Sequence, residues 1–120
     1  MQLKEYCEKA NRTNAELEDT QLNDLHMILG MVTEIGELAD TFKKELAYKK
    51  DLDWINIKEE LGDIFWYLGN FCYINDINPE EILDINIAKL QSSYPDKFTE
   101  HNALNRDLEK ERIILESLKQ

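Results

Sequence analysis

What this chain of 120 residues has little of excludes several classes of protein. It contains two Pro and four Gly, and no Ser- or Gly-rich stretch that would serve as a linker. Its two cysteines, Cys7 and Cys72, are far apart and form no Cys-x-x-Cys pair. That spacing excludes a disulfide framework and a cysteine-based zinc site, and it favours a reducing compartment. No apolar run approaches the roughly 18 residues of a membrane span, and no charged-then-apolar leader opens the chain. We therefore expect a cytoplasmic protein without a membrane partner.

Basic residues are also scarce, since 14 Lys and Arg stand against 25 Asp and Glu and the formal net charge is −11. A protein that holds a long polyanion with its own side chains needs clustered Lys and Arg. The acid excess therefore argues against a nucleic-acid partner. It leaves open a small phosphate-bearing ligand that binds together with metal ions.

The length and the hydrophobic pattern predict a single helical domain over residues 1–120, because compact domains typically hold about 100–150 residues. Strand signals are sparse, with no sustained alternation and no Asn-Gly or Asp-Gly turn. Apolar residues instead recur every three or four positions, as amphipathic helices require. The fold class is therefore all-α, an antiparallel bundle of four to five helices. The expected helices cover residues 20–48, 54–75, 79–92 and 100–118, with a less regular helix in the first 17 residues. Asp53, Asn78 and Thr99 are expected to cap helices, and Pro79 suits a first helical position.

Two pairs of acidic residues stand in unusually apolar surroundings. Glu34 and Glu37 lie in the most apolar part of the longest predicted helix, and Glu60 and Asp63 lie in the next helix. The i, i+3 spacing places each pair on one face of its helix. Four converging carboxylates would form a hard-oxygen site suited to Mg²⁺ or Mn²⁺. The alternative is an acidic bundle whose charges simply face water.

A glycine stands inside each acidic pair, Gly36 in the first and Gly62 in the second. A helical Gly costs about 1 kcal/mol relative to Ala, and a like-charge pair costs a further few tenths. Because such costs need an offset, we expect the two glycines to let two helices approach closely.

The motifs resemble the signature of a known family. Residues 34–38 have the sequence EIGEL, 22 residues separate Glu37 from Glu60, and residues 60–68 have the sequence ELGDIFWYL. This pattern resembles the ExxE…ExxD signature of the MazG-like all-α nucleotide pyrophosphohydrolases. Residues 86–90, NIAKL, resemble a further segment of that family together with the Tyr-Pro and Phe that follow. The resemblance covers roughly residues 22–107.

The resemblance implies a specific reaction. Glu34, Glu37, Glu60 and Asp63 would hold one or more Mg²⁺, with Mn²⁺ as a possible substitute. The metals would bind the triphosphate of an NTP or a dNTP, and an activated water would attack the α-phosphorus to release a nucleoside monophosphate and pyrophosphate. Metal ions neutralise phosphates and lower the pKa of a bound water, so an acidic protein can bind an anionic substrate. One carboxylate is expected to act as general base, and the family usually works as a homodimer or homotetramer.

The resemblance also names residues on the substrate side. Lys89 matches a lysine that contacts the phosphates, and Asn86 matches an asparagine that helps to position them. One departure is Ser93, which stands where the family often carries an Arg before its Tyr-Pro. A lost guanidinium removes a bidentate phosphate clamp, for which Lys97 or Arg106 could compensate.

Tyr67 follows Asp63 at i+4 and shares its helix face. It could stack on a base or ribose near the metal, or it could be a packed core aromatic. Two alternatives to the main function are open at this point. One is a catalytically idle interaction or regulatory module of the same fold. The other is an enzyme for a different phosphoanhydride, such as the dNTP of one base or a hyperphosphorylated guanosine alarmone.

Overall fold

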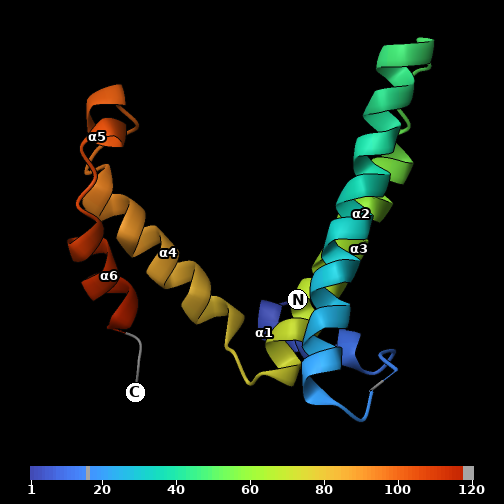
Figure 1. Cartoon of the computed structure of the whole chain (residues 1–120), viewed down its shortest axis with the longest axis horizontal. Helices are drawn as coiled ribbons and strands as arrows, with labels where there is room; N and C mark the ends of the chain where they lie inside the picture. Colours follow the sequence, from blue (N-terminus) through green and yellow to red (C-terminus); the bar gives the residue numbers. More distant parts are fainter. Residues whose placement is uncertain (16, 118–120) are drawn as a thin grey trace. The chain divides into compact units, whose positions relative to one another are not determined.

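The computed structural model describes residues 1–15 and 17–117, and the regular elements in that part of the chain are all helices (Figure 1). The six helices are α1 (Leu3–Asn11), α2 (Thr20–Tyr48), α3 (Trp54–Ile74), α4 (Pro79–Ser93), α5 (Glu100–Leu104) and α6 (Leu108–Glu116). The all-α prediction is confirmed, with a helix count slightly above the expected four to five. The helices form two compact units, Met1–Ile77 and Asn78–Gln120.

Side-chain caps fix where the main helices begin. Asp19, Asp53 and Asn78 cap α2, α3 and α4 by accepting backbone N–H bonds of 2.8–3.2 Å. Thr99 caps α5 in the same way at 3.0 Å, and Pro79 occupies the start of α4. The caps predicted at positions 53, 78 and 99 are confirmed, because a short polar side chain before an amphipathic run satisfies the free N–H groups of the first turn.

The first helix is shorter than expected, since α1 ends at Asn11. Asn23 near the start of α2 is 3% exposed and holds the segment that follows α1. Its carboxamide accepts from the Leu17 N–H and donates to the Leu17 carbonyl, each at 2.7 Å. A side chain that pairs both backbone groups of one residue offers that residue an alternative to helical hydrogen bonds.

The first unit is organised around a close contact between α2 and α3. Gly30 lies against the ring of Tyr67, so that a Cβ placed at Gly30 would fall 2.1 Å from a ring carbon. Met27, one turn earlier on α2, is completely buried. Further along the same pair of helices, Nδ2 of Asn56 donates to Oγ1 of Thr41 at 3.0 Å.

The glycine that allows this approach differs from the two expected ones. A Cβ at Gly36 or at Gly62 would meet no atom within 4 Å, and both residues are exposed. The prediction that they bring this chain's own helices together is therefore wrong, and Gly30 has that role. The sequence alone does not distinguish these helical glycines, because which of them faces a neighbouring helix depends on tertiary packing.

The single helix predicted over residues 100–118 is two helices. The chain leaves α5 at Asn105, whose carboxamide donates to the His101 carbonyl at 2.8 Å. Asp107 then accepts the Lys110 N–H at 3.0 Å and begins α6. Asp107 is therefore a helix cap that the apolar periodicity conceals. Residue 118, the predicted helix end, lies outside the described residues.

The second unit packs α6 on α4 around an ion pair in which Glu111 is buried and Arg106 is exposed. Glu111 of α6 is 5% exposed, and it accepts two hydrogen bonds from Arg106, at 2.8 Å from Nε and 2.6 Å from Nη2. The Ser93 hydroxyl of α4 donates to the same carboxylate. The hydrogen bonds from Arg106, and then the one from Ser93, hold the pKa of Glu111 at about 2.

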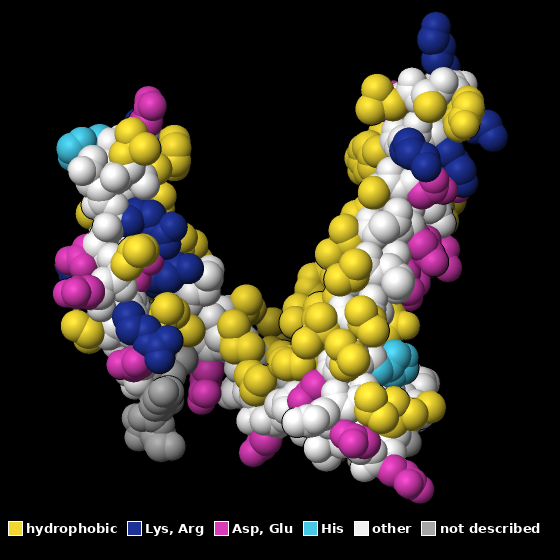
Figure 2. Space-filling model, viewed as in Figure 1, with side chains coloured by type: hydrophobic (Ala, Val, Ile, Leu, Met, Phe, Trp, Pro, Cys, Tyr) yellow, Lys and Arg dark blue, Asp and Glu magenta, His cyan; other side chains and the backbone are white. Residues whose placement is uncertain are grey.

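Much apolar surface stays exposed outside these contacts. Figure 2 shows hydrophobic side chains gathered along the pair of helices α2 and α3. None of the described helices is long and apolar enough to cross a membrane.

Gly30→Ala should lower the free energy of unfolding by about 1–3 kcal/mol, because the added methyl group must displace the Tyr67 ring. Gly62→Ala is the matched control, since it adds the same methyl to a helix in open space and should raise the free energy of unfolding by up to about 1 kcal/mol. Urea unfolding followed by circular dichroism measures both. Equal effects would contradict the contact between Gly30 and Tyr67.

Acid should destabilise the second unit through Glu111. Its pKa is about 2 when folded against an ordinary 4.5, so between these values the unfolded chain binds more protons. The stabilisation is present above pH 4.5 and is lost as the pH falls through the folded pKa. Unfolding in urea from pH 6 to 2 should therefore show a weaker pH dependence in Glu111→Gln than in the wild type. The control is Glu116→Gln, which removes an exposed pair with Arg112. If Glu111→Gln and Glu116→Gln show the same pH dependence of unfolding, Glu111 is not the cause of the acid sensitivity.

Candidate metal centre

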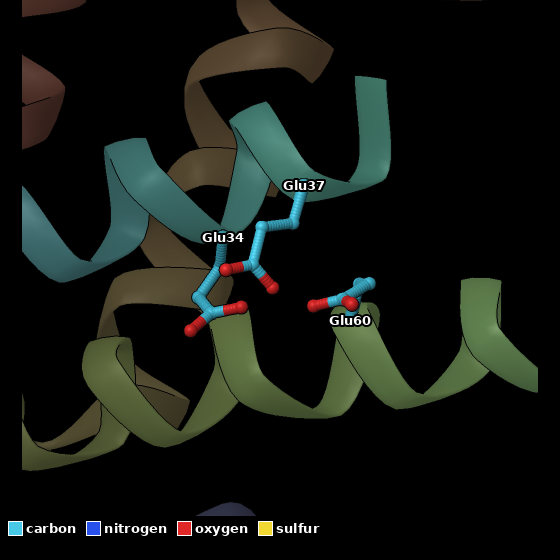
Figure 3. A group of neighbouring side chains, drawn as sticks. All are labelled: Glu34, Glu37 and Glu60. Carbon is cyan, nitrogen blue, oxygen red and sulfur yellow. The ribbon is translucent and has the colours of Figure 1, made fainter. Parts of the chain in front are cut away.

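Three carboxylates from two helices converge in the first unit (Figure 3). Glu34 and Glu37 of α2 and Glu60 of α3 each offer one carboxylate oxygen, and these oxygens all lie within 4.8 Å of one another. Burial is uneven, because Glu37 is exposed, Glu34 is half-buried and Glu60 is only 7% exposed. The cluster therefore reaches from solvent into the contact between the two helices.

The register of the helical hairpin produces this convergence. Successive helices joined by a short connection run antiparallel, and Gly30 of α2 lies against Tyr67 of α3. Seven residues on from Gly30 is Glu37, and seven residues back from Tyr67 is Glu60. The two glutamates are therefore level with each other on facing helices.

The donor set fits a hard divalent cation. Oε2 of Glu34 and Oε2 of Glu60 are buried, and the described residues offer neither of them a hydrogen-bond donor. A buried acceptor without a donor is costly, and coordination to a cation is the usual alternative to a donor for a carboxylate. Ligands that are all oxygen suit Mg²⁺ or Mn²⁺. Glu34, Glu37 and Glu60 could therefore hold such an ion.

Crowding of like charges shows in the pKa of Glu60, which rises from 4.5 to about 7. The largest cause is the side-chain contact with Glu34, followed by burial and then by the charge of Glu37. Neighbouring carboxylates disfavour each other's ionised form. A bound divalent cation would supply the positive charge that relieves this repulsion.

Asp63, the fourth predicted carboxylate, lies outside the cluster of three. Four residues on from Gly30 is Glu34, and four residues back from Tyr67 is Asp63, so the Asp63 backbone is level with Glu34. Its side chain is exposed. The pKa of Tyr6 on α1 is raised by burial first, then by the charge of Cys7 and then by that of Asp63.

Tyr67 is part of the packing between α2 and α3. Besides its contact with Gly30, its ring meets His26 edge-on at a centroid distance of 6.0 Å and Trp66 edge-on at 4.9 Å. The half-buried ring is thus fixed by three neighbours. Tyr67 is therefore a packed aromatic residue, as one of the two alternatives had it. That it also stacks on a substrate stays a prediction.

Asn86 and Lys89 lie on α4, in the second unit. Asn86 is exposed and Lys89 is half-buried. The charge of Lys89 makes a minor contribution to the low pKa of Glu111, which is set mainly by the hydrogen bonds from Arg106 and Ser93. That Asn86 and Lys89 contact a substrate stays a prediction.

The sequence patterns do not predict the cluster formed by Ser93, Arg106 and Glu111. Ser93 replaces the expected Arg, and its hydroxyl is engaged by Glu111. Arg106, which could have compensated, is committed to the same carboxylate through two hydrogen bonds. One feature of the sequence points to Glu111: it stands two residues before the apolar run Ile113, Ile114 and Leu115, in a part of the helix where buried positions are expected.

Comparison with known proteins gives two similar chains. Gene 37 protein of Mycobacterium phage L5 is 31% identical over 74 residues, which are 56% of this chain and 62% of that protein. Tetratricopeptide repeat protein 17 of Danio rerio is 40% identical over 57 residues, which are 46% of this chain and 5% of that protein. This chain therefore spans less than two thirds of either protein. No solved structure matches it.

The family comparison covers the helices that carry the carboxylates. The family model of the MazG nucleotide pyrophosphohydrolase domain matches residues 23–98. This range is more than half of the chain, and it contains α3, α4 and nearly all of α2. The chain belongs to the MazG nucleotide pyrophosphohydrolase domain family.

Proposed function

We propose that this chain is a metal-dependent nucleoside triphosphate pyrophosphohydrolase that converts an NTP or a dNTP to the monophosphate and pyrophosphate. The observation that carries the proposal is the cluster of Glu34, Glu37 and Glu60, in which two buried carboxylate oxygens find no hydrogen-bond donor among the described residues. The cluster stands on helices within the family match. The match supports the reaction class, and the cluster supports metal dependence.

Mg²⁺ is the proposed cation, with Mn²⁺ as a substitute. Bound to the cluster, it would neutralise phosphate charge and lower the pKa of a water molecule. The net charge of −11 otherwise repels a triphosphate. This is why an acidic protein without a cation is a poor receptor for such a substrate.

The carboxylates of the chain would hold the cation, and one of them would accept the proton of the attacking water. The oxygen of that water forms a bond to the α-phosphorus, while the bond from the α-phosphorus to the α–β bridging oxygen breaks. Pyrophosphate leaves with the electron pair of that bond. Lys89 and Asn86 are proposed to bind the phosphates, and Tyr67 is proposed to lie close to the base or the ribose.

A homodimer or homotetramer is the proposed assembly. Large apolar side chains are exposed in both units, among them Val32 at 61% and Ile87 at 54%. Apolar surface of this extent is typical of proteins that associate.

Glu37→Gln and Glu60→Gln should each lower pyrophosphate release by at least about 100-fold, because removing a ligand costs more than the 10–100-fold loss typical of its hydrogen-bonding partners. Both should also lose the rise in melting temperature that Mg²⁺ gives the wild type. Without Mg²⁺ they should be as stable as the wild type or more stable, because the repulsion around Glu60 is reduced. Glu59→Gln is the matched control, since Glu59 is an exposed neighbour on the same helix. Wild-type turnover in Glu60→Gln would refute the metal centre.

Asp63→Asn tests the fourth carboxylate separately. We expect it to abolish pyrophosphate release and to weaken the Mg²⁺ dependence of the melting temperature, because Asp63 is level with Glu34 and a side-chain rotation brings it toward the cation. Stability without metal should be unchanged, since the Asp63 side chain is exposed. A variant with full turnover and an unchanged response to Mg²⁺ would limit the centre to three carboxylates.

A panel of NTPs and dNTPs, assayed for pyrophosphate with and without Mg²⁺, separates the proposal from its alternatives. Release from one dNTP alone, or from a hyperphosphorylated guanosine nucleotide alone, would narrow the substrate. Absence of both release and a Mg²⁺-dependent rise in melting temperature would refute the proposal and favour a catalytically idle interaction module.

A further inference from the structure

A cavity lies within the second unit, where the end of α4 meets α5 and the start of α6. Its volume is about 200 Å³, and its lining includes Ser92, Asn102, Arg106 and Lys110. The lining residues all lie between positions 92 and 110, so the second unit alone shapes the cavity. The carboxylates of the candidate metal centre belong to the first unit and take no part in it.

We propose that this cavity binds a small oxyanion of the phosphate type, either as a free ion or as the phosphate group of a larger ligand. The site is additional to the phosphate contacts proposed for Asn86 and Lys89, which are not part of the lining. Binding there needs neither the metal nor the hydrolysis reaction. Its support comes from the orientation of Arg106, the charge of Lys110, the polar groups beside them and the size of the cavity.

Arg106 lines the cavity with a guanidinium whose orientation is already fixed. Its Nε and Nη2 donate to Glu111 at 2.8 and 2.6 Å. Glu111 is 5% exposed and also accepts from the Ser93 hydroxyl. A guanidinium has five N–H donors, so the two donors of Nη1 remain unpaired within the described chain. A donor group that is held in place before a ligand arrives loses less conformational entropy when it binds.

Lys110 adds a positive charge that no carboxylate of the described residues pairs with. Asp107 also lines the cavity, and its Oδ1 accepts the Lys110 backbone N–H at 3.0 Å. The described lining therefore carries two cations and one carboxylate, although the net charge of the chain is −11. Glu111 is not part of the lining, and Lys89 adds a further positive charge near it. A local excess of positive charge favours an anion.

Polar groups complete the cavity beside the two cations. The Ser92 hydroxyl and the Asn102 carboxamide are half-buried, and neither makes a hydrogen bond within the part of the chain that the structure describes. Hydroxyl and amide donors commonly contact phosphate oxygens together with Arg and Lys. An ion pair with a structural role alone would need neither an unpaired lysine nor free donors around it.

The size of the cavity limits the ligand. Pockets for drug-sized molecules have volumes of about 300–1,000 Å³, and this one has about 200 Å³. Since one water molecule takes up about 30 Å³ in the liquid, there is room for a phosphate or a pyrophosphate ion. A nucleotide would place its phosphate group in the cavity and keep its base and sugar outside.

Isothermal titration calorimetry of the full chain tests the site, with orthophosphate and pyrophosphate as probes in low salt and EDTA. EDTA removes divalent cations, so the candidate metal centre cannot bind the probes through a metal. Both should bind the wild type, and Lys110→Gln should weaken both at least about tenfold, as the loss of one charge-assisted hydrogen bond implies. Circular dichroism should be unchanged, because the Lys110 side chain is exposed.

Arg112→Gln is the matched control, since it removes one positive charge from the same helix at an exposed residue outside the lining. It should bind both probes as the wild type does. A wild type that binds neither probe would overturn the proposal. Equal affinities of Lys110→Gln and the wild type would overturn it as well.

Nuclear magnetic resonance tests the location. Orthophosphate should shift the backbone amide signals of residues 92–110 in the wild type, and sodium chloride at equal ionic strength should not. Shifts confined to residues 1–77, or identical shifts with chloride, would overturn the proposal.

A nucleoside monophosphate, titrated under the same conditions, distinguishes the two sources of the oxyanion. If Lys110→Gln weakens its binding as much as that of orthophosphate, the cavity accepts the phosphate group of a nucleotide. If only the binding of the inorganic ions depends on Lys110, the ligand is the free ion. Absence of pyrophosphate release from any nucleotide would leave these results unaffected.

Discussion

The contact between Gly30 and Tyr67 is the constraint on which the candidate metal centre depends. The ring occupies the space that any side chain at Gly30 would need, since a Cβ there would lie 2.1 Å from it. His26 and Trp66 meet the same ring edge-on, so its position is fixed from several sides. With this one point of contact set, the antiparallel register places Glu37 level with Glu60 seven residues away. A wider separation of α2 and α3 would move these carboxylates apart.

This register creates an electrostatic problem inside the chain. One oxygen from each of three carboxylates lies within 4.8 Å of the others, and two of the carboxylate oxygens are buried without a donor in the part of the chain that the structure describes. The raised pKa of Glu60 expresses the same repulsion. A structure selected for stability alone has no reason to keep this arrangement, because apolar residues of similar size would pack there without repulsion. A divalent cation removes the repulsion and satisfies the buried oxygens at once, which is the physical basis for regarding the cluster as a site.

Structural features that depend on residues close together in the sequence were predictable, whereas features that depend on contacts between separate helices were not. Helix starts at Asp53, Asn78 and Thr99 were predictable because a cap acts within three residues. The role of Gly30 was not, because the difference between Gly30 and Gly36 lies in what faces each of them across the helix pair. The division between α5 and α6 depends on the Asp107 cap, which a continuous apolar pattern outweighed. The motif spacing predicted four converging carboxylates, and the structure brings Glu34, Glu37 and Glu60 together. The direction of the Asp63 side chain is a choice of rotamer that spacing does not determine.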